Sequence, residues 1–340
     1  MNVGLVGGGS ISDTHARAAR SIPGVEITAV YGQNRTKADR LAHLYGGTPF
    51  DDFTRFLTHR PMDLVAIGSP SGLHAEHGIA AARHGLHVIV EKPLDVTTAK
   101  GDALIQAADR AGVKLGVFFQ DRLKPDVRRM KSLVDQGRLG SPVLASARVK
   151  WHRGSEYYAA SRWRGTFALD GGGALINQAI HTVDLLLWLF GDVRRVYGRT
   201  ATRVHAIEAE DTAVAALEFD SGALGVLEAA TSVYPGYARR LELTGTNGTL
   251  VLDHDRLASA DLRDGPAAEF PLPPVSDQES VTSPTVSDPT PHRRVLEDFI
   301  NAIDTGATPA CDGREGRRSL ALVEAVYESA RSGQPVSIAR

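Results

Sequence analysis

Short apolar runs alternate with helix-forming segments along the first 120 residues, and this alternation constrains the fold more strongly than any other feature of the chain. The runs that predict strands span residues 2–7, 25–32, 62–70, 86–90 and 113–119. The helical segments between them span residues 13–22, 37–46, 74–85 and 96–112. Continuously apolar strands separated by helices are typical of a parallel sheet that helices cover on both faces. We therefore predict an α/β fold that begins with a doubly wound parallel sheet.

The rest of the chain has a different pattern, in which strands alternate between apolar and polar residues. Strands are predicted at residues 143–151 and repeatedly between 194 and 253, where the turns Asp220–Gly222 and Thr246–Gly248 indicate hairpins. The remaining predictions are helices at 124–137, 174–191, 292–304 and 314–332, and an exposed loop at 264–290.

These patterns predict two domains, one of residues 1–121 and one of residues 122–340. The second is expected to be an α+β domain with an open, mostly antiparallel sheet that binds substrate and forms oligomers. The sequence is also compatible with C-terminal helices that pack back against the first domain.

Composition excludes several classes of protein. The 340 residues carry a net charge of −2. This charge provides no overall electrostatic attraction for nucleic acid or for an acidic substrate. Cys311 is the single cysteine, so an internal disulfide framework is excluded, and we expect no metal site. The apolar block 182–190 is too short to cross a bilayer, and no signal peptide is recognised. We expect a cytoplasmic protein with neither nucleic-acid nor membrane partners.

A glycine-rich turn follows the first predicted strand. Gly7, Gly9 and Ser12 have the spacing of the Rossmann dinucleotide-binding motif, with Ser10 and Ile11 between them. The glycines permit a tight turn and a close approach of a pyrophosphate, to which the following helix offers N–H groups. We therefore predict that this turn binds a nicotinamide dinucleotide.

The end of the second predicted strand bears on the choice between NAD and NADP. Gly32 occupies the position where an acid would bind a ribose 2′-hydroxyl, and Asn34 and Arg35 follow. A cation here favours a 2′-phosphate, although Arg35 could equally be a solvated residue at a helix start. The predicted cofactor is NAD(P)(H), with a preference for NADP.

Lys92 ends the fourth predicted strand, between Glu91 and Pro93. The loops after parallel strands converge on the edge of the sheet where a cofactor binds. A lysine held there can exchange a proton with a substrate hydroxyl if its pKa is lowered, whereas the alternative is a solvated lysine. His15, on the first helix, is expected to be structural. Other cofactor contacts are predicted after later strands, at Ser69, Pro70, Ser71, His74, Glu91, Lys92 and Gln120.

A polar face is predicted on the apolar helix 174–191. Asn177, His181, Asp184 and Trp188 are spaced i, i+4, i+7 and i+11 and so share that face. His181 could be a general base oriented by Asp184, or a structural histidine.

The sequence resembles the Gfo/Idh/MocA family of oxidoreductases through residues 3–12, 69–96, 170–191 and 298–333. The resemblance implies that Lys92 assists proton transfer while hydride passes between a nicotinamide and a sugar or polyol carbon. It also implies a catalytic or substrate-binding role for His181. Inositol-dehydrogenase-like members carry an aspartate one turn before this histidine, where this chain has Asn177. An amide cannot ionise, so Asn177 is expected to orient a sugar hydroxyl.

Residues 150–181 resemble the subgroup that includes bacterial UDP-N-acetyl-glucosaminuronate 3-dehydrogenases, which oxidise the C3 hydroxyl of a sugar nucleotide. Trp163 could pack on a pyranose ring, and Arg153 or Arg164 could pair with a carboxylate or phosphate. The other predicted substrate contacts are Lys92, Arg122, Tyr157, Tyr158, Asn177, Gln178 and His181, and the predicted catalytic residues are Lys92, Asn177, His181 and Asp184.

Two other functions are compatible with the same residues. One is redox-assisted glycoside cleavage with a retained cofactor, and the other is a non-catalytic regulator that binds a sugar or nucleotide. The alternating strands of the second domain leave one apolar sheet face exposed, and another protein surface is expected to pack against it. We therefore expect a homodimer or homotetramer formed through that sheet.

Overall fold

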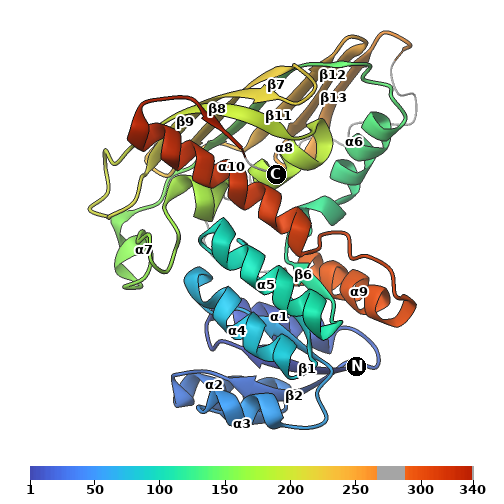
Figure 1. Cartoon of the computed structure of the whole chain (residues 1–340), viewed down its shortest axis with the longest axis vertical. Helices are drawn as coiled ribbons and strands as arrows, with labels where there is room; N and C mark the ends of the chain where they lie inside the picture. Colours follow the sequence, from blue (N-terminus) through green and yellow to red (C-terminus); the bar gives the residue numbers. More distant parts are fainter. Residues whose placement is uncertain (266–287, 339–340) are drawn as a thin grey trace. The chain divides into compact units, whose positions relative to one another are not determined.

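The structure is a computed structural model that describes residues 1–265 and 288–338 (Figure 1). It divides into two compact units. The first comprises Met1–Gln120 and the described part of Pro284–Arg317, and the second comprises the described parts of Asp121–Ser283 and Arg318–Arg340.

The first unit is built on a six-stranded sheet in the order β3-β2-β1-β4-β5-β6, in which all pairs are parallel. The strands are β1 (Asn2–Val6), β2 (Glu26–Tyr31), β3 (Thr48–Phe50), β4 (Leu64–Ile67), β5 (His87–Val90) and β6 (Leu115–Val117). The helices are α1 (Ser10–Arg20), α2 (Arg35–Tyr45), α3 (Phe53–Thr58), α4 (His74–Arg83), α5 (Thr98–Ala111) and α9 (Thr290–Thr305), with a short 3₁₀ turn at Ser71–Leu73. The prediction of a doubly wound parallel sheet is confirmed.

The strand order fixes where a ligand can bind. The chain goes from β1 outward to β2 and β3, then returns to the other side of β1 with β4, so the loops after β1 and β4 are neighbours. Every residue of β4 is buried, as expected for a strand covered on both faces. Helices α4 and α5 lie side by side, whereas α1 packs with α2 and α9 (Figure 1).

Helix α9 belongs to the first unit although it follows the second unit in the chain. Its Phe299 is buried against Gly116 of β6, where an added Cβ would lie 2.7 Å from the phenylalanine ring. Only a residue without a side chain allows this approach.

The second unit is built on an eight-stranded sheet in the order β13-β12-β11-β7-β10-β9-β8-β14. Its strands are β7 (Pro142–Lys150), β8 (Val193–Ala201), β9 (Thr212–Phe219), β10 (Leu224–Ala230), β11 (Arg240–Gly245), β12 (Gly248–Asp253), β13 (Arg256–Leu262) and β14 (Val336–Ser337). Only β7 and β10 pair in parallel, and both predicted hairpins form, as β9–β10 and β11–β12. The prediction of an open, mostly antiparallel sheet is therefore confirmed.

Helices α6 (Pro125–Asp135) and α8 (Ile180–Phe190) pack against this sheet, while α7 (Ser155–Ala159) is a short surface helix and α10 (Gly313–Ser332) runs from the first unit into the second. A 3₁₀ turn, Gln120–Leu123, leads into α6. Most of the loop predicted at 264–290 lies outside the described residues. In the described ranges, no helix combines the length and apolarity needed to span a membrane.

The helix predicted at 174–191 differs from the prediction in its first part. A π-helix spans Ala174–Ala179 and α8 begins only at Ile180. A π-helical turn holds more residues than an α-helical turn, so the expected 3.6-residue spacing does not hold across this segment. Asn177, His181 and Trp188 are partly exposed, whereas Asp184 is buried.

Candidate functional site

The glycine-rich turn after β1 has the shape that a dinucleotide requires. Gly7 adopts a φ of +122°, and a Cβ there would lie 2.6 Å from Ser12 Oγ and 2.7 Å from the carbonyl oxygen of Gly68. Gly9 precedes α1, and no atom lies within 4 Å of where its Cβ would stand. The turn therefore needs glycine at position 7 and leaves open space at position 9.

The start of α1 is suited to a diphosphate. Its N-cap Gly9 supplies no side-chain hydrogen bond, so the first N–H groups, including those of Ser10 and Ile11, face that turn without a side-chain cap. Ser12 Oγ is buried and has no hydrogen-bond partner among the described residues. N–H groups at a helix start and a buried hydroxyl without a partner both fit a phosphate ligand.

The loop after β2 contains the predicted adenosine contacts. Gly32 follows the strand, and Asn34 caps α2 by accepting a hydrogen bond from Lys37 N at 3.1 Å. The Arg35 side chain is 52% exposed; its Nε donates to Asp39 at 2.8 Å, and a terminal nitrogen lies 3.8 Å from Asp51. A 2′-phosphate would have to compete with two carboxylates for this guanidinium.

The loop after β4 is braced by a buried histidine. The two ring nitrogens of His74 lie 3.0 Å from the carbonyl oxygen of Ser69 and 2.8 Å from that of Pro93. Burial lowers the pKa of His74, whereas its hydrogen bonds to the two carbonyl oxygens raise it, because only the protonated ring has an N–H for each of them. His74 thus ties the loop of Ser69, Pro70 and Ser71 to the loop after β5.

Beneath the loop after β5, Glu91 is buried between two histidines. His15 Nε2 from α1 lies 2.8 Å from Glu91 Oε1, and His292 Nε2 from α9 lies 3.3 Å from the same oxygen. The other oxygen accepts the backbone N–H of Lys92 at 3.1 Å. Phe118 stacks on His15 with ring centroids 4.4 Å apart. We refer to His15, Glu91 and His292 as the Glu91 cluster.

The protonation of the Glu91 cluster follows from these contacts. Burial acts to raise the pKa of Glu91, but the hydrogen bonds from His15 and His292 hold it well below its usual range. Burial also lowers the pKa of His15. The Nδ1 atoms of both histidines have no hydrogen-bond partner among the described residues, so each ring is best assigned as neutral with its proton on Nε2. The cluster is then a carboxylate held by neutral donors.

Lys92 is therefore fixed through its backbone. Its N–H is held by Glu91, and the loop beyond it is held by Asp95, whose buried carboxylate accepts N–H groups of Ala75 at 2.8 Å and Val96 at 2.6 Å. Gln120, after β6, has a buried Oε1 without a partner among the described residues. All predicted cofactor contacts thus lie in the first unit, at the carboxyl ends of its strands, although both oxygens of Glu91 are directed into the protein.

In the second unit, a hydrogen-bonded network surrounds the predicted substrate residues. The Asn177 amide donates to Asp170, and its oxygen accepts from Gln178 Nε2 at 2.8 Å. Gln178 also donates to Tyr157 Oη at 2.9 Å and accepts from Arg153 at 2.8 Å. The orientation of the Asn177 amide is therefore set by its neighbours.

Aromatic rings and cations lie together beside this network. Arg164 lies 4.3 Å from the centre of the Tyr157 ring and 5.8 Å from that of Trp163, and it donates to the Tyr157 carbonyl at 2.8 Å. The Tyr158 hydroxyl pairs with Thr231 at 2.8 Å, and burial raises the pKa of Tyr158 to about 12. These tyrosines therefore act as hydrogen-bonding groups and stay protonated at neutral pH.

His181 has a different carboxylate neighbour from the one expected. Its Nδ1 lies 3.7 Å from Asp121, while Asp184 forms a buried ion pair with Arg122 at 2.6 and 2.8 Å. Burial acts to raise the pKa of Asp121, but the charges of Arg239 and Lys124 hold it well below its usual range. Asp121 is thus a fixed negative charge near His181.

Several of these residues were not found by sequence reasoning. Asp170 directly precedes a glycine run, which was a usable signal for a buried acid at a turn. Asp121, Glu210 and His292 gave no local signal, because their partners are distant in the chain. Glu210 accepts the N–H groups of Gly173 and Leu175 at the start of the π-helix.

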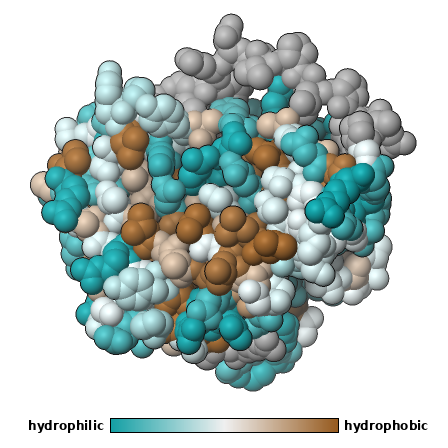
Figure 2. Space-filling model, turned by 90° about the horizontal axis from the view of Figure 1, so that it is seen from above, coloured by the Kyte–Doolittle hydropathy of each residue, from teal (hydrophilic) through white to brown (hydrophobic). Residues whose placement is uncertain are grey.

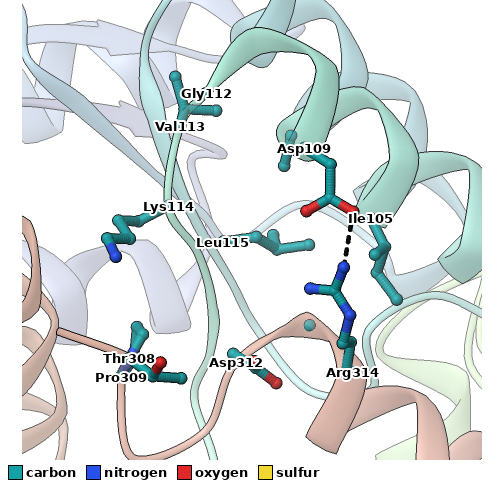
Figure 3. A pocket seen from close by; sticks show the side chains of 12 residues that line it. Ile105, Asp109, Gly112, Val113, Lys114, Leu115, Thr308, Pro309, Asp312 and Arg314 are labelled. Atoms are coloured by element: carbon teal, nitrogen blue, oxygen red, sulfur yellow. Dashed lines mark hydrogen bonds and ion pairs between the residues drawn. The ribbon is translucent and has the colours of Figure 1, made fainter. Parts of the chain in front are cut away.

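A separate hollow of about 280 Å³ lies in the first unit, next to the residues that precede β6 (Figure 3). Its charged groups bond to their surroundings: Arg314 pairs with Asp109 at 2.7 Å, and Lys114 donates to the carbonyls of Gly306 and Ala307. The hollow is at the amino end of β6, the opposite edge of the sheet from the glycine-rich turn, so it is not the candidate site.

Comparison with known families gives two matches. Residues 1–119 match the model described as "Oxidoreductase family, NAD-binding Rossmann fold", and residues 127–251 match the "GFO/IDH/MocA C-terminal domain". The chain is 29% identical to a D-apiose dehydrogenase of Paraburkholderia graminis over 98% of this chain and 88% of that protein. It is 26% identical to a D-glucoside 3-dehydrogenase of Escherichia coli, over 99% and 97% of the two chains.

Among solved structures, the WlbA dehydrogenase from Bordetella pertussis, in complex with NADH and UDP-GlcNAcA, is 33% identical to this chain. The match covers 100% of this chain and 99% of that one, with a TM-score of 0.90. Levoglucosan dehydrogenase, at 22% identity and a TM-score of 0.86, shares the fold.

The Glu91 cluster predicts a specific pH dependence of stability. Replacing His292 with Phe keeps a ring beside Phe118 but removes one donor to a buried carboxylate. We expect the free energy of unfolding to fall by about 2–3 kcal/mol at pH 7. A depressed acid pKa stabilises the fold above the usual glutamate pKa of about 4.3, and that stability is lost as the pH falls through the folded-state value. The deficit of His292→Phe should therefore shrink on acidification.

Urea unfolding of both proteins between pH 3 and pH 7 measures this deficit. The control pair is Glu91→Gln and Glu91→Gln/His292→Phe, in which the deficit should not vary with pH. A deficit in His292→Phe that is equal at all pH values would contradict an ionised Glu91.

Proposed function

We propose, because the chain belongs to the GFO/IDH/MocA family of NAD-binding oxidoreductases, that it transfers hydride between a nicotinamide and the C3 hydroxyl of a sugar, sugar acid or sugar nucleotide. The observation that carries this proposal is the placement of Lys92. It follows β5 at the same sheet edge as the glycine-rich turn, on a backbone held by Glu91. The names of the relatives support a sugar, and D-glucoside 3-dehydrogenase supports C3.

The first unit supplies residues that fit the cofactor. Gly7, Gly9 and the first turn of α1 would hold the diphosphate, and Ser12 Oγ is a buried donor without a described partner. Residues after β2 would hold the adenosine ribose, and those after β4, β5 and β6 the nicotinamide half. When bound, the nicotinamide accepts or supplies the hydride.

Lys92 and His181 are the proposed residues for the proton. Oxidation of a hydroxyl releases one proton in addition to the hydride, so a base must take it. Lys92 can do so when its amine is neutral, and His181 has the charge of Asp121 nearby to stabilise its protonated ring. Asn177 takes no proton, but Asp170 and Gln178 orient its amide, which suits it to hold a sugar hydroxyl.

An anionic substituent on the sugar is supported by the arginines of the second unit. Arg153 and Arg164 both lie beside Tyr157, and Trp163 adds an apolar surface of the kind that packs on a pyranose ring. A guanidinium pairs well with a carboxylate or a phosphate. A uronate or sugar nucleotide is therefore the preferred substrate class.

The proposal predicts that Lys92→Ala abolishes turnover without abolishing cofactor binding. Loss of a positioned acid–base group costs about 10²- to 10⁴-fold in kcat. The measurement is reduction of added NAD or NADP at 340 nm with hexoses, hexuronates and UDP-sugars, together with cofactor affinity by fluorescence. Lys131→Ala, on α6, is the matched control and should behave as wild type.

Turnover that persists in Lys92→Ala would contradict a role for Lys92 in proton transfer. A product that forms without net reduction of the added cofactor would instead indicate redox-assisted cleavage with a retained cofactor.

Arg35 is proposed to bind the 2′-phosphate of NADP. The absence of an acid at Gly32 and the exposure of Arg35 support this, while Asp39 and Asp51 oppose it by pairing with the guanidinium. Loss of a charge-assisted contact to the phosphate is expected to weaken binding by roughly tenfold or more. Arg35→Ala should therefore raise KM for NADP at least tenfold with little change for NAD, and Asp39→Asn should lower KM for NADP. An unchanged NADP/NAD ratio in both variants would exclude Arg35 from the cofactor site.

The open face of the eight-stranded sheet is proposed to join copies of this chain. In Figure 2, apolar atoms gather near the middle of the face. In register across β8, β9 and β10 lie Tyr197, Ala216 and Val226, with Leu224 and Val226 57% and 43% exposed. Ion pairs such as Arg195–Glu218 and Lys150–Glu228 flank them. An apolar centre with a polar rim is typical of a subunit interface.

Val226→Glu would place a charge at the centre of that interface. We expect sedimentation velocity to show a smaller species than for wild type, because the buried charge would have no partner. Val204→Glu, at an exposed position outside the sheet, should leave the species unchanged. A monomeric wild-type protein would exclude the interface.

A further inference from the structure

Glu210 is a buried acid that takes no part in the chemistry described above. It lies just before β9, and its side chain is 4% exposed. One carboxylate oxygen accepts the N–H of Gly173 at 3.0 Å, and the other accepts the N–H of Leu175 at 2.8 Å and the hydroxyl of Tyr327 at 3.0 Å. Its main-chain oxygen accepts the N–H of Ala174 at 2.9 Å.

These contacts hold the start of the π-helix. The first N–H groups of any helix have no partner within it, and here one residue accepts those of Gly173, Ala174 and Leu175. A Cβ added to Gly173 would overlap the carbonyl oxygen of Glu210, and one added to Gly172 would overlap the hydroxyl of Tyr327. The backbone of Gly172 and Gly173 therefore packs directly against Glu210 and Tyr327, with no space for a side chain between them.

We propose that Glu210 is a positioning residue, which fixes the segment that carries Asn177, Gln178 and His181 only while its carboxyl group is ionised. The three residues follow the anchored N–H groups within eight positions, on the π-helix and the first turn of α8. Protonation removes the negative charge and places a donor on one carboxyl oxygen, so the group then holds its three present hydrogen-bond donors more weakly. The consequence for catalysis rests on the function proposed above.

The ionisation lies in the range where enzymes are assayed. Burial raises the pKa of Glu210 to about 7, against the opposing effect of the hydrogen bonds from Leu175, Tyr327 and Gly173. The titratable group that faces it is Tyr327 from α10, whose own pKa is raised well above its usual range by burial. Within the described ranges no lysine, arginine or histidine forms an ion pair with Glu210.

Two substitutions at this site have different expected effects on the pH dependence of kcat. In wild type, kcat should fall as the pH drops through about 7. Glu210→Gln cannot ionise, so kcat should stay low throughout, and only the titration of the catalytic base, Lys92 or His181, should remain in its profile. Tyr327→Phe removes a hydrogen bond that lowers the pKa of Glu210, so the limb should move to higher pH. Glu208→Gln, at an exposed neighbouring glutamate, should keep the wild-type profile.

A second measurement needs no activity. In protein labelled with ¹⁵N-leucine, the amide shift of Leu175 should titrate near pH 7 in wild type, at higher pH in Tyr327→Phe, and not at all in Glu210→Gln. The same titration without any sugar oxidation would support the positioning role and reject the proposed function. A kcat in Glu210→Gln equal to that of wild type, or a Leu175 amide that does not titrate near pH 7, would overturn the role of Glu210.

Discussion

The buried carboxylate of Glu91 is the constraint on which the candidate cofactor site depends. A charge in the interior is tolerated only when hydrogen bonds replace its water, and here the donors come from His15 on α1, His292 on α9 and the backbone of Lys92. The carboxylate thus ties together the helix after the glycine-rich turn, the end of β5 and a helix from the far end of the chain. Lys92, the residue proposed to transfer the proton, is positioned because its backbone cannot move without exposing that charge.

The second unit uses a buried glutamate for a similar purpose but with the opposite electrostatic result. Glu91 has two imidazole donors and a depressed pKa, whereas Glu210 has backbone donors and a tyrosine, which do not outweigh its burial. The first carboxylate is therefore ionised at neutral pH, whereas the pKa of the second is about 7. Both hold backbone rather than substrate, so a change in either would alter the geometry of the site without removing a reacting group.

The sequence predicted the parts of the site that depend on local chemistry. The glycine spacing, the Glu-Lys-Pro stretch and the hairpin turns each lie within a few residues, and their geometry follows from those residues alone. The same reasoning expected Asp184 to orient His181, because both lie on one helix; instead Asp184 is paired with Arg122, and Asp121 lies near His181. It could not find His292 or Tyr327, whose partners Glu91 and Glu210 lie much earlier in the chain, just after β5 and just before β9.

The proposed reaction moves a hydride from a sugar carbon to a nicotinamide. The most direct measurement is transfer of deuterium from sugars labelled at C3, with the mass of the reduced cofactor as the readout. Hexoses, hexuronates and UDP-sugars would be supplied with NAD and NADP to the purified protein. We predict that a uronate or sugar nucleotide labels the reduced cofactor with its deuterium. A cofactor that binds but gains no label from any of these sugars would contradict the account.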